Sequence, residues 1–142
     1  MKCLIDSSAV ILVLKWLKEK SVEALNGQAT LNLAYYEINN VVWKQCAIEG
    51  SINFQEAIDR AKEVAQILEI MSIEELRSPE EVGEAMKYAV EQGLTFYDAS
   101  YLQKAKSKNY VLVTEDKELF KKSEYVGVKA ITVKEFLNLI KL

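Results

Sequence analysis

Short apolar runs that alternate with longer segments of helical periodicity are the feature that most limits how this sequence can fold. Residues 3–5 and 110–114 are almost unbroken apolar stretches, and shorter runs lie near residues 31–33, 70–73 and 128–131. A strand without polar alternation is typical of the centre of a parallel sheet, because helices cover both of its faces. Five such runs separated by helices predict an α/β protein with a central parallel sheet.

Capping signals mark where several of the intervening helices begin. Asn53 with Glu56 and Thr132 with Glu135 have the spacing of capping boxes, and Pro79 occupies a favoured first helical position. We find no repeat or internal boundary, so we expect a single domain over residues 1–142. With their capping residues, the expected helices cover residues 9–20, 36–49, 53–68, 78–93, 95–105, 116–122 and 132–140.

Composition removes several classes of function. The chain contains no histidine, which excludes Ser-His-Asp and Cys-His catalysis, His-ligated zinc and His-driven attack of a ribose 2′-hydroxyl. Cys3 and Cys46 are too few for a four-thiolate site, and we expect both to be reduced and packed. No leader and no run of about 18 apolar residues is visible, so we expect a cytoplasmic protein without a membrane span. With a net charge of −3, contact with nucleic acid would need a local cationic rim.

Four carboxylates stand where strands end or helices begin. Asp6 follows the first strand, Asp116 follows the fourth, and Glu37 and Asp98 lie in the first turns of helices. Taken singly, an acid at a helix start is more often a cap than a ligand. If the first and fourth strands are neighbours, however, all four can converge at the carboxyl edge of the sheet. Oxygen ligands without thiolate or imidazole suit Mg²⁺ or Mn²⁺, and such ions support phosphodiester hydrolysis.

Four segments resemble the PIN-domain ribonucleases, and within them the VapC-type toxins of toxin–antitoxin pairs. The segments are IDSSA, YEINN, LTFYDASYL and LVTED, and they occur in the order typical of that family across essentially the whole chain. The third segment and the Thr-x-Asp element of the fourth are the more specific ones. The resemblance implies a three-layer α/β/α sandwich with strand order 3-2-1-4-5. It also implies a homodimer and a small antitoxin that blocks the site.

The resemblance further implies the roles of individual residues. Asp6, Glu37, Asp98 and Asp116 would form the acidic quartet that holds the metal, and two hydroxyls would orient carboxylate or water. By this analogy an Mg²⁺-activated water attacks an RNA phosphodiester in line and leaves a 5′-phosphate. The two supporting hydroxyls are those of Ser8 and Thr114.

Lysines near the expected site are candidates for binding the phosphates of a substrate. Lys15 follows the first strand, Lys44 lies two turns beyond Glu37, and Lys104 lies in the helix that begins near Asp98. Phosphate contacts require such cations. A solvated helix face is the more common alternative for any one of them.

Aromatic residues offer a second set of candidates for binding a partner. Tyr35, Tyr36 and Tyr97 flank the acids and are able to stack on an unpaired base, although packing at helix starts is the more common role. Trp16 and Trp43 would either anchor an interface with a second chain or pack in the core, and core packing is the more common outcome.

The sequence favours a metal-dependent endoribonuclease, with two alternatives open. One is a housekeeping RNA-processing nuclease, and the other is a catalytically idle binding module with the same fold. Other α/β phosphate enzymes fit less well. Ser8 stands where dehalogenase-like phosphatases need a second Asp, Ile5 stands where response regulators need an acid, and no phosphate-cradling glycine loop occurs.

Overall fold

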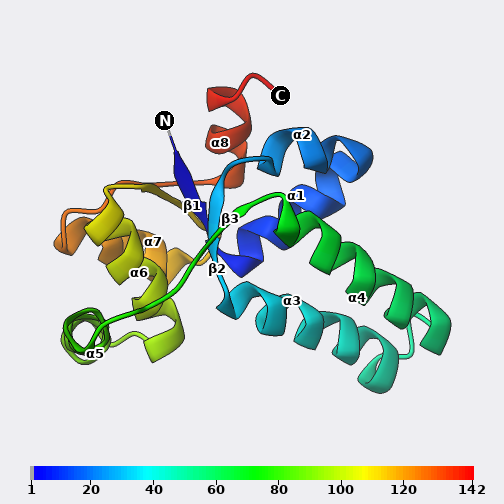
Figure 1. Ribbon diagram of the computed structural model, residues 1–142, viewed down its shortest axis with the longest axis horizontal. Helices are drawn as coiled ribbons and strands as arrows, with labels where there is room; N and C mark the ends of the chain where they lie inside the picture. Colours follow the sequence, from blue (N-terminus) through cyan, green and yellow to red (C-terminus); the bar gives the residue numbers. More distant parts are fainter. Residues whose placement is uncertain (1) are drawn as a thin grey trace.

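A computed structural model describes residues 2–142 as a three-layer α/β/α sandwich around a five-stranded sheet (Figure 1). The strand order is β3-β2-β1-β4-β5, and every neighbouring pair is parallel. Both the predicted fold class and the predicted strand order are therefore confirmed. The strands are β1 (Cys3–Ile5), β2 (Ala29–Leu31), β3 (Ser72–Glu74), β4 (Val111–Val113) and β5 (Ala130–Ile131).

In residues 2–142, eight α-helices lie between or after the strands and cover both faces of the sheet. Figure 1 shows α5, α6 and α7 on one side and the other helices on the opposite side. The helices are α1 (Ser7–Leu17), α2 (Ser21–Leu25), α3 (Leu33–Trp43), α4 (Phe54–Glu69), α5 (Pro79–Gln92), α6 (Phe96–Lys108), α7 (Lys117–Tyr125) and α8 (Val133–Leu139), with a 3₁₀ turn at Lys18–Lys20 and a π turn at Lys44–Ile48. Within residues 2–142, no helix is both long and apolar enough to cross a bilayer.

The apolar core is divided by the sheet, because side chains of a strand point alternately to its two faces. Cys3 and Ile5 of β1 join the core beneath α1, α3, α4 and α8, whereas Leu4 joins the core beneath α6 and α7. All three residues are fully buried, and the central pair β1–β4 is held in register with Ile5 opposite Val113. This pairing fixes the edge at which both strands end.

Capping behaves as the sequence predicted. Asn53 and Thr132 both form complete capping boxes with the glutamates three residues later. Ser78 caps α5, because its hydroxyl accepts the Glu81 N–H, and Pro79 is the first residue of that helix. Helix α5 ends at Gly93, whose φ of +65° lies in the left-handed region that favours glycine.

The bounds of four strands differ from the sequence prediction: β4 and β5 are shorter than the runs 110–114 and 128–131, and β2 and β3 are displaced from theirs. Leu33, expected in the second strand, is the first residue of α3, because the chain turns into helical geometry at Asn32. The Asn32 N–H still donates to the Glu74 carbonyl of β3, at 2.9 Å, so the sheet ends at this point. The third strand begins at Ser72, since Ile70 still caps α4.

Candidate active site

Asp6 directly follows β1, and its side chain caps the N-terminus of α1. Its Oδ1 accepts hydrogen bonds from the Ala9 N–H at 2.9 Å and from the Ser8 hydroxyl at 2.8 Å. Its own N–H donates to the Val113 carbonyl of β4, at 3.1 Å. The carboxylate is thus fixed to both the sheet and the helix, and Ser8 orients it as the resemblance implied.

Asp116 lies at the end of the neighbouring strand and begins α7. Its N–H donates to Thr114 Oγ1 at 3.0 Å, and its Oδ1 accepts the Leu119 N–H at 2.9 Å. Thr114 is fully buried, and its hydroxyl lies near enough to the Asp6 carboxyl to lower the pKa of that group. This threonine therefore lies next to both acids that follow the central strands.

The remaining two acids reach the same edge from helices. Glu37 projects from α3 and Asp98 from the first turn of α6. The pKa of Asp98 is raised by partial burial and then by the negative charges of Asp116 and Glu37, while Asp98 in turn raises the pKa of Asp6. These mutual charge effects indicate that the four acids, which come from four separate segments, lie in one region at the carboxyl edge of the sheet.

Burial makes Asp6 the most perturbed of these carboxylates. The side chain is only 5% exposed, and desolvation raises its pKa from 3.8 to about 6. Hydrogen bonds from Thr114, Ala9 and Ser8 act in the opposite direction without cancelling the effect. A buried acid with a pKa near neutrality is typical of a functional site, although structural networks produce such values too.

Tyr101 belongs to the site, and sequence reasoning assigned it no role. Its ring is 1% exposed, and its hydroxyl donates to Glu37 Oε1 at 3.0 Å. Burial and the charge of Glu37 raise the pKa of the phenol, so it remains a donor. The sequence did contain one indication of this role: Tyr101 follows Asp98 by three residues, and residues three apart share a helix face.

The acidic pocket contains no basic counter-ion. Every ion pair within residues 2–142 joins other acids, and none involves Asp6, Glu37, Asp98 or Asp116. As the side chains stand, no three His, Cys, Asp or Glu residues of this range are close enough to share one metal ion. Four carboxylates in one region without a basic partner nevertheless suit a hard divalent cation chemically, because its charge would offset their repulsion.

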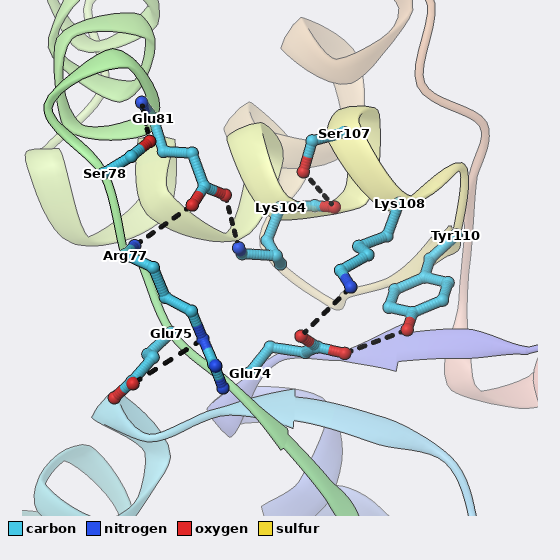
Figure 2. A network of polar contacts seen from close by, with 9 residues as sticks. All are labelled: Glu74, Glu75, Arg77, Ser78, Glu81, Lys104, Ser107, Lys108 and Tyr110. Atoms are coloured by element: carbon cyan, nitrogen blue, oxygen red, sulfur yellow. Dashed lines mark hydrogen bonds and ion pairs between the residues drawn. The ribbon is translucent and has the colours of Figure 1, made fainter.

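The prediction that Lys104 binds a substrate phosphate is wrong. Its side chain is 3% exposed, and its Nζ lies 2.5 Å from Glu81 Oε2 on α5 (Figure 2). An amine this deeply buried needs its partner carboxylate and is not accessible to RNA. Lys15 and Lys44 are exposed, so their predicted role stays a prediction.

Further polar contacts join the side of helix α6 that is directed toward α5 and β3 to those two elements. Lys108 lies 4.0 Å from Glu74, whose other oxygen accepts the Tyr110 hydroxyl at 2.9 Å (Figure 2). Together with the Lys104–Glu81 pair, these contacts fix the end of α6 opposite to Asp98. They support the site from a distance, since the acids require a rigid frame.

The exposed aromatic residues correct a second expectation. Trp16 and Trp43 are 51% and 52% exposed, so core packing is wrong for both. Tyr36 and Tyr97 are 75% and 59% exposed and do not pack at their helix starts, whereas Tyr35 is partly buried. The two cysteines are free thiols as predicted, with Cys3 buried and Cys46 half-buried in the π turn.

The fold and the four acids together define a class: three-layer α/β/α proteins with carboxylates grouped at the carboxyl edge of a parallel sheet. Residues 3–125 match the PIN domain family, and the chain belongs to that family. The resemblance drawn from four short segments is confirmed.

Individual relatives agree with this assignment. Exonuclease VapC9 of Pyrobaculum aerophilum is 36% identical over 125 residues, which cover 85% of each chain. Ribonuclease VapC3 of the same organism is 30% identical over 127 residues, which cover 86% of this chain and 95% of that protein. The crystal structure of PAE2754, also from P. aerophilum, superposes with a TM-score of 0.81 and 31% identity, over 100% of this chain and 98% of the other.

Proposed function

We propose that this chain is a VapC-type toxin that cleaves RNA as a divalent-metal-dependent endoribonuclease, with residues 1–142 as one nuclease domain. The observation that carries the proposal is the convergence of Asp6, Glu37, Asp98 and Asp116 without a basic partner. The names of the relatives, an exonuclease and a ribonuclease, support nuclease chemistry.

Each acid has a role that follows from its surroundings. Asp6 and Asp98 are buried or half-buried and are the direct ligands of Mg²⁺ or Mn²⁺ in this proposal. Glu37 is held by Tyr101 and either ligates or orients the attacking water. Asp116 is exposed and completes the site directly or through water. When bound, the cation polarises the phosphate and lowers the pKa of the attacking water.

The proposed product is the one that the family resemblance implies. In this proposal water is the nucleophile, and cleavage leaves a 5′-phosphate and a 3′-hydroxyl. The absence of histidine agrees with a reaction that does not use the ribose 2′-hydroxyl as nucleophile. Ser8 and Thr114 hold the Asp6 carboxylate for this reaction.

A cleavage assay tests the mechanism. Circular and linear RNAs are incubated with Mg²⁺ or Mn²⁺, because only an endonuclease opens a circle. We expect cleavage by the natural protein, and no cleavage with chelator or with Asp98→Asn. Asp59→Asn on the exposed face of α4 is the matched control and should cut normally. Cleavage by Asp98→Asn at the natural rate would refute the assignment, and cleavage of linear RNA alone would replace the endonuclease by an exonuclease.

The biological role is tested in cells. We propose a small antitoxin as the inhibitory partner and a homodimer as the assembly, both in the cytoplasm. Induction of the natural protein should arrest growth, Asp98→Asn should not, and co-expression of the product of the adjacent gene should restore growth. Unaffected growth during active RNA cleavage would favour the housekeeping nuclease instead. RNA binding without cleavage would favour the idle binding module.

A further inference from the structure

Helix α3, which also carries Glu37, has a shallow aromatic hollow on its surface. Five residues line this open hollow, whose volume is about 520 Å³. Tyr36, Asn40 and Trp43 repeat at helical spacing, so they form one continuous face. The lining residues are Tyr35, Tyr36, Asn39, Asn40 and Trp43.

The aromatic rings of this hollow are free to contact a ligand. Tyr36 is 75% exposed and Trp43 is 52% exposed, although both rings have large apolar surfaces that are favourably buried. Stacking of a base on an aromatic ring contributes to the binding of single-stranded nucleic acid, independently of sequence. Two exposed rings on one face of the helix therefore offer a surface on which a planar ligand can stack.

The hollow also contains the amides of Asn39 and Asn40. The Asn39 Nδ2 donates to the Tyr35 carbonyl at 2.8 Å, which fixes that side chain. Its Oδ1 is buried and accepts no hydrogen bond from any residue in the range 2–142. Asn40 is exposed one turn after Glu37. Amides are the side chains that pair with the edges of bases.

Electrostatics indicates why stacking is needed next to this site. The acidic pocket repels phosphate, the net charge of the chain is −3, and the predicted phosphate ligand Lys104 is sequestered in an ion pair. Counter-ion release therefore contributes less to RNA affinity than it does in basic proteins. Contacts with uncharged bases would therefore add binding free energy beyond what the exposed Lys15 and Lys44 contribute.

We propose that the α3 hollow binds one unpaired base of the RNA, adjacent to the phosphate that is cut at Glu37 and its neighbouring acids. This inference rests on the proposed ribonuclease function. It favours single strands or loops as the substrate, because a base stacked inside a duplex has no free face to offer to Tyr36 or Trp43.

Trp43 fluorescence provides a direct test. The chain has two tryptophans, so Trp16→Phe leaves Trp43 as the only tryptophan emitter. In this background Asp98→Asn prevents cleavage during titration with an adenylate octanucleotide, while labelled RNA reports binding by anisotropy. We expect quenching of Trp43 by the single strand, and at least tenfold weaker binding of the same sequence in a duplex. RNA binding with unchanged Trp43 emission would overturn the proposal.

Substitutions of Tyr36 separate stacking from general surface effects. Tyr36→Ala should weaken single-strand binding roughly 10- to 100-fold, Tyr36→Phe should preserve it, and Tyr125→Ala should not change it. Tyr125 is the matched control, because it is 65% exposed on α7. Equal effects of the two alanine variants would overturn the subsite.

Sedimentation distinguishes RNA from a second copy of the chain as the occupant. If Tyr36→Ala dissociates a dimer while RNA affinity per protomer is unchanged, the hollow is a protein interface and the proposal is wrong. Cleavage and Trp43 fluorescence, measured together, also separate the base-binding proposal from the proposed nuclease function. Cleavage without a Trp43 response refutes only the subsite, whereas a Trp43 response without cleavage by the natural protein refutes the nuclease and retains the RNA-binding hollow.

Discussion

Asp6→Asn is expected to stabilise the metal-free protein at neutral pH, although it removes a carboxylate of the site. Burial and Asp98 raise the pKa of Asp6 to about 6, whereas the ordinary value of 3.8 applies in the unfolded chain. Between these values the folded state retains a proton that the unfolded state has released. The stability of the natural protein therefore falls as pH rises from about 4 to about 6, and the full penalty remains above that window.

The structure sets the size of this effect. A rise of the pKa from 3.8 to about 6 corresponds to roughly 3 kcal/mol, because each pKa unit is worth about 1.4 kcal/mol. Asparagine keeps an oxygen that can accept the Ala9 N–H, so the start of α1 survives. For a chain of this length, 1 kcal/mol shifts Tm by roughly 2–4 °C. We expect Asp6→Asn to raise Tm at pH 7.5 by roughly 5–10 °C more than the same substitution does at pH 4.

Urea unfolding in chelator checks this expectation. The free energy of unfolding is measured at pH 4 and pH 7.5 for the natural protein and for Asp6→Asn, and the variant's gain is compared between the two pH values. This comparison cancels any static cost of burying the new amide. Asp59→Asn, with its exposed carboxylate, should show no such difference. An Asp6→Asn effect that is the same at both pH values would contradict the assigned burial energetics.

Three further predictions concern other contacts. Tyr101→Phe removes the donor to Glu37 and should lower metal affinity or RNA cleavage roughly 10- to 100-fold with an unchanged circular dichroism spectrum; natural activity would exclude a positioning role. Lys104→Met leaves Glu81 unpaired and should cost about 2–3 kcal/mol in urea unfolding, and Lys104→Met with Glu81→Gln should recover part of it; additive losses would contradict the pairing. Asn53→Ala removes a complete capping box and should lower stability by about 1 kcal/mol, measured by thermal unfolding; no loss would mean that α4 starts elsewhere.

Local signals predicted most of the fold, because they depend on residues close in sequence. The boxes at Asn53 and Thr132 form as expected, since both partners belong to the same helical turn. The segment 31–33 was misassigned because Leu31 and Leu33 alternate with a polar residue, as they would in a strand. The chain instead turns at Asn32, where pairing with β3 ends, and that event depends on Glu74, which lies 42 residues away in the sequence.

The site was predicted more completely than the environment around it. The sequence singled out Asp6 because a charge at the end of an apolar strand would be buried and would need a partner. The structure shows that Asp6 is buried. The burial of Lys104 was not predictable, since α6 packs on several sides and has no polar face by which an exposed lysine is recognised. Tyr101 was missed because its partner lies 64 residues earlier.

The contacts of α6 make its internal spacing one of the least variable dimensions of the molecule. Asp98 reaches the pocket, Tyr101 holds Glu37, and Lys104 and Lys108 meet acids of α5 and β3. A single inserted or deleted residue within this stretch would rotate everything after it by about 100° and misalign several of these pairs at once. Length changes between homologous chains should therefore accumulate in the connections outside α6, and this helix should serve as the fixed reference for aligning them.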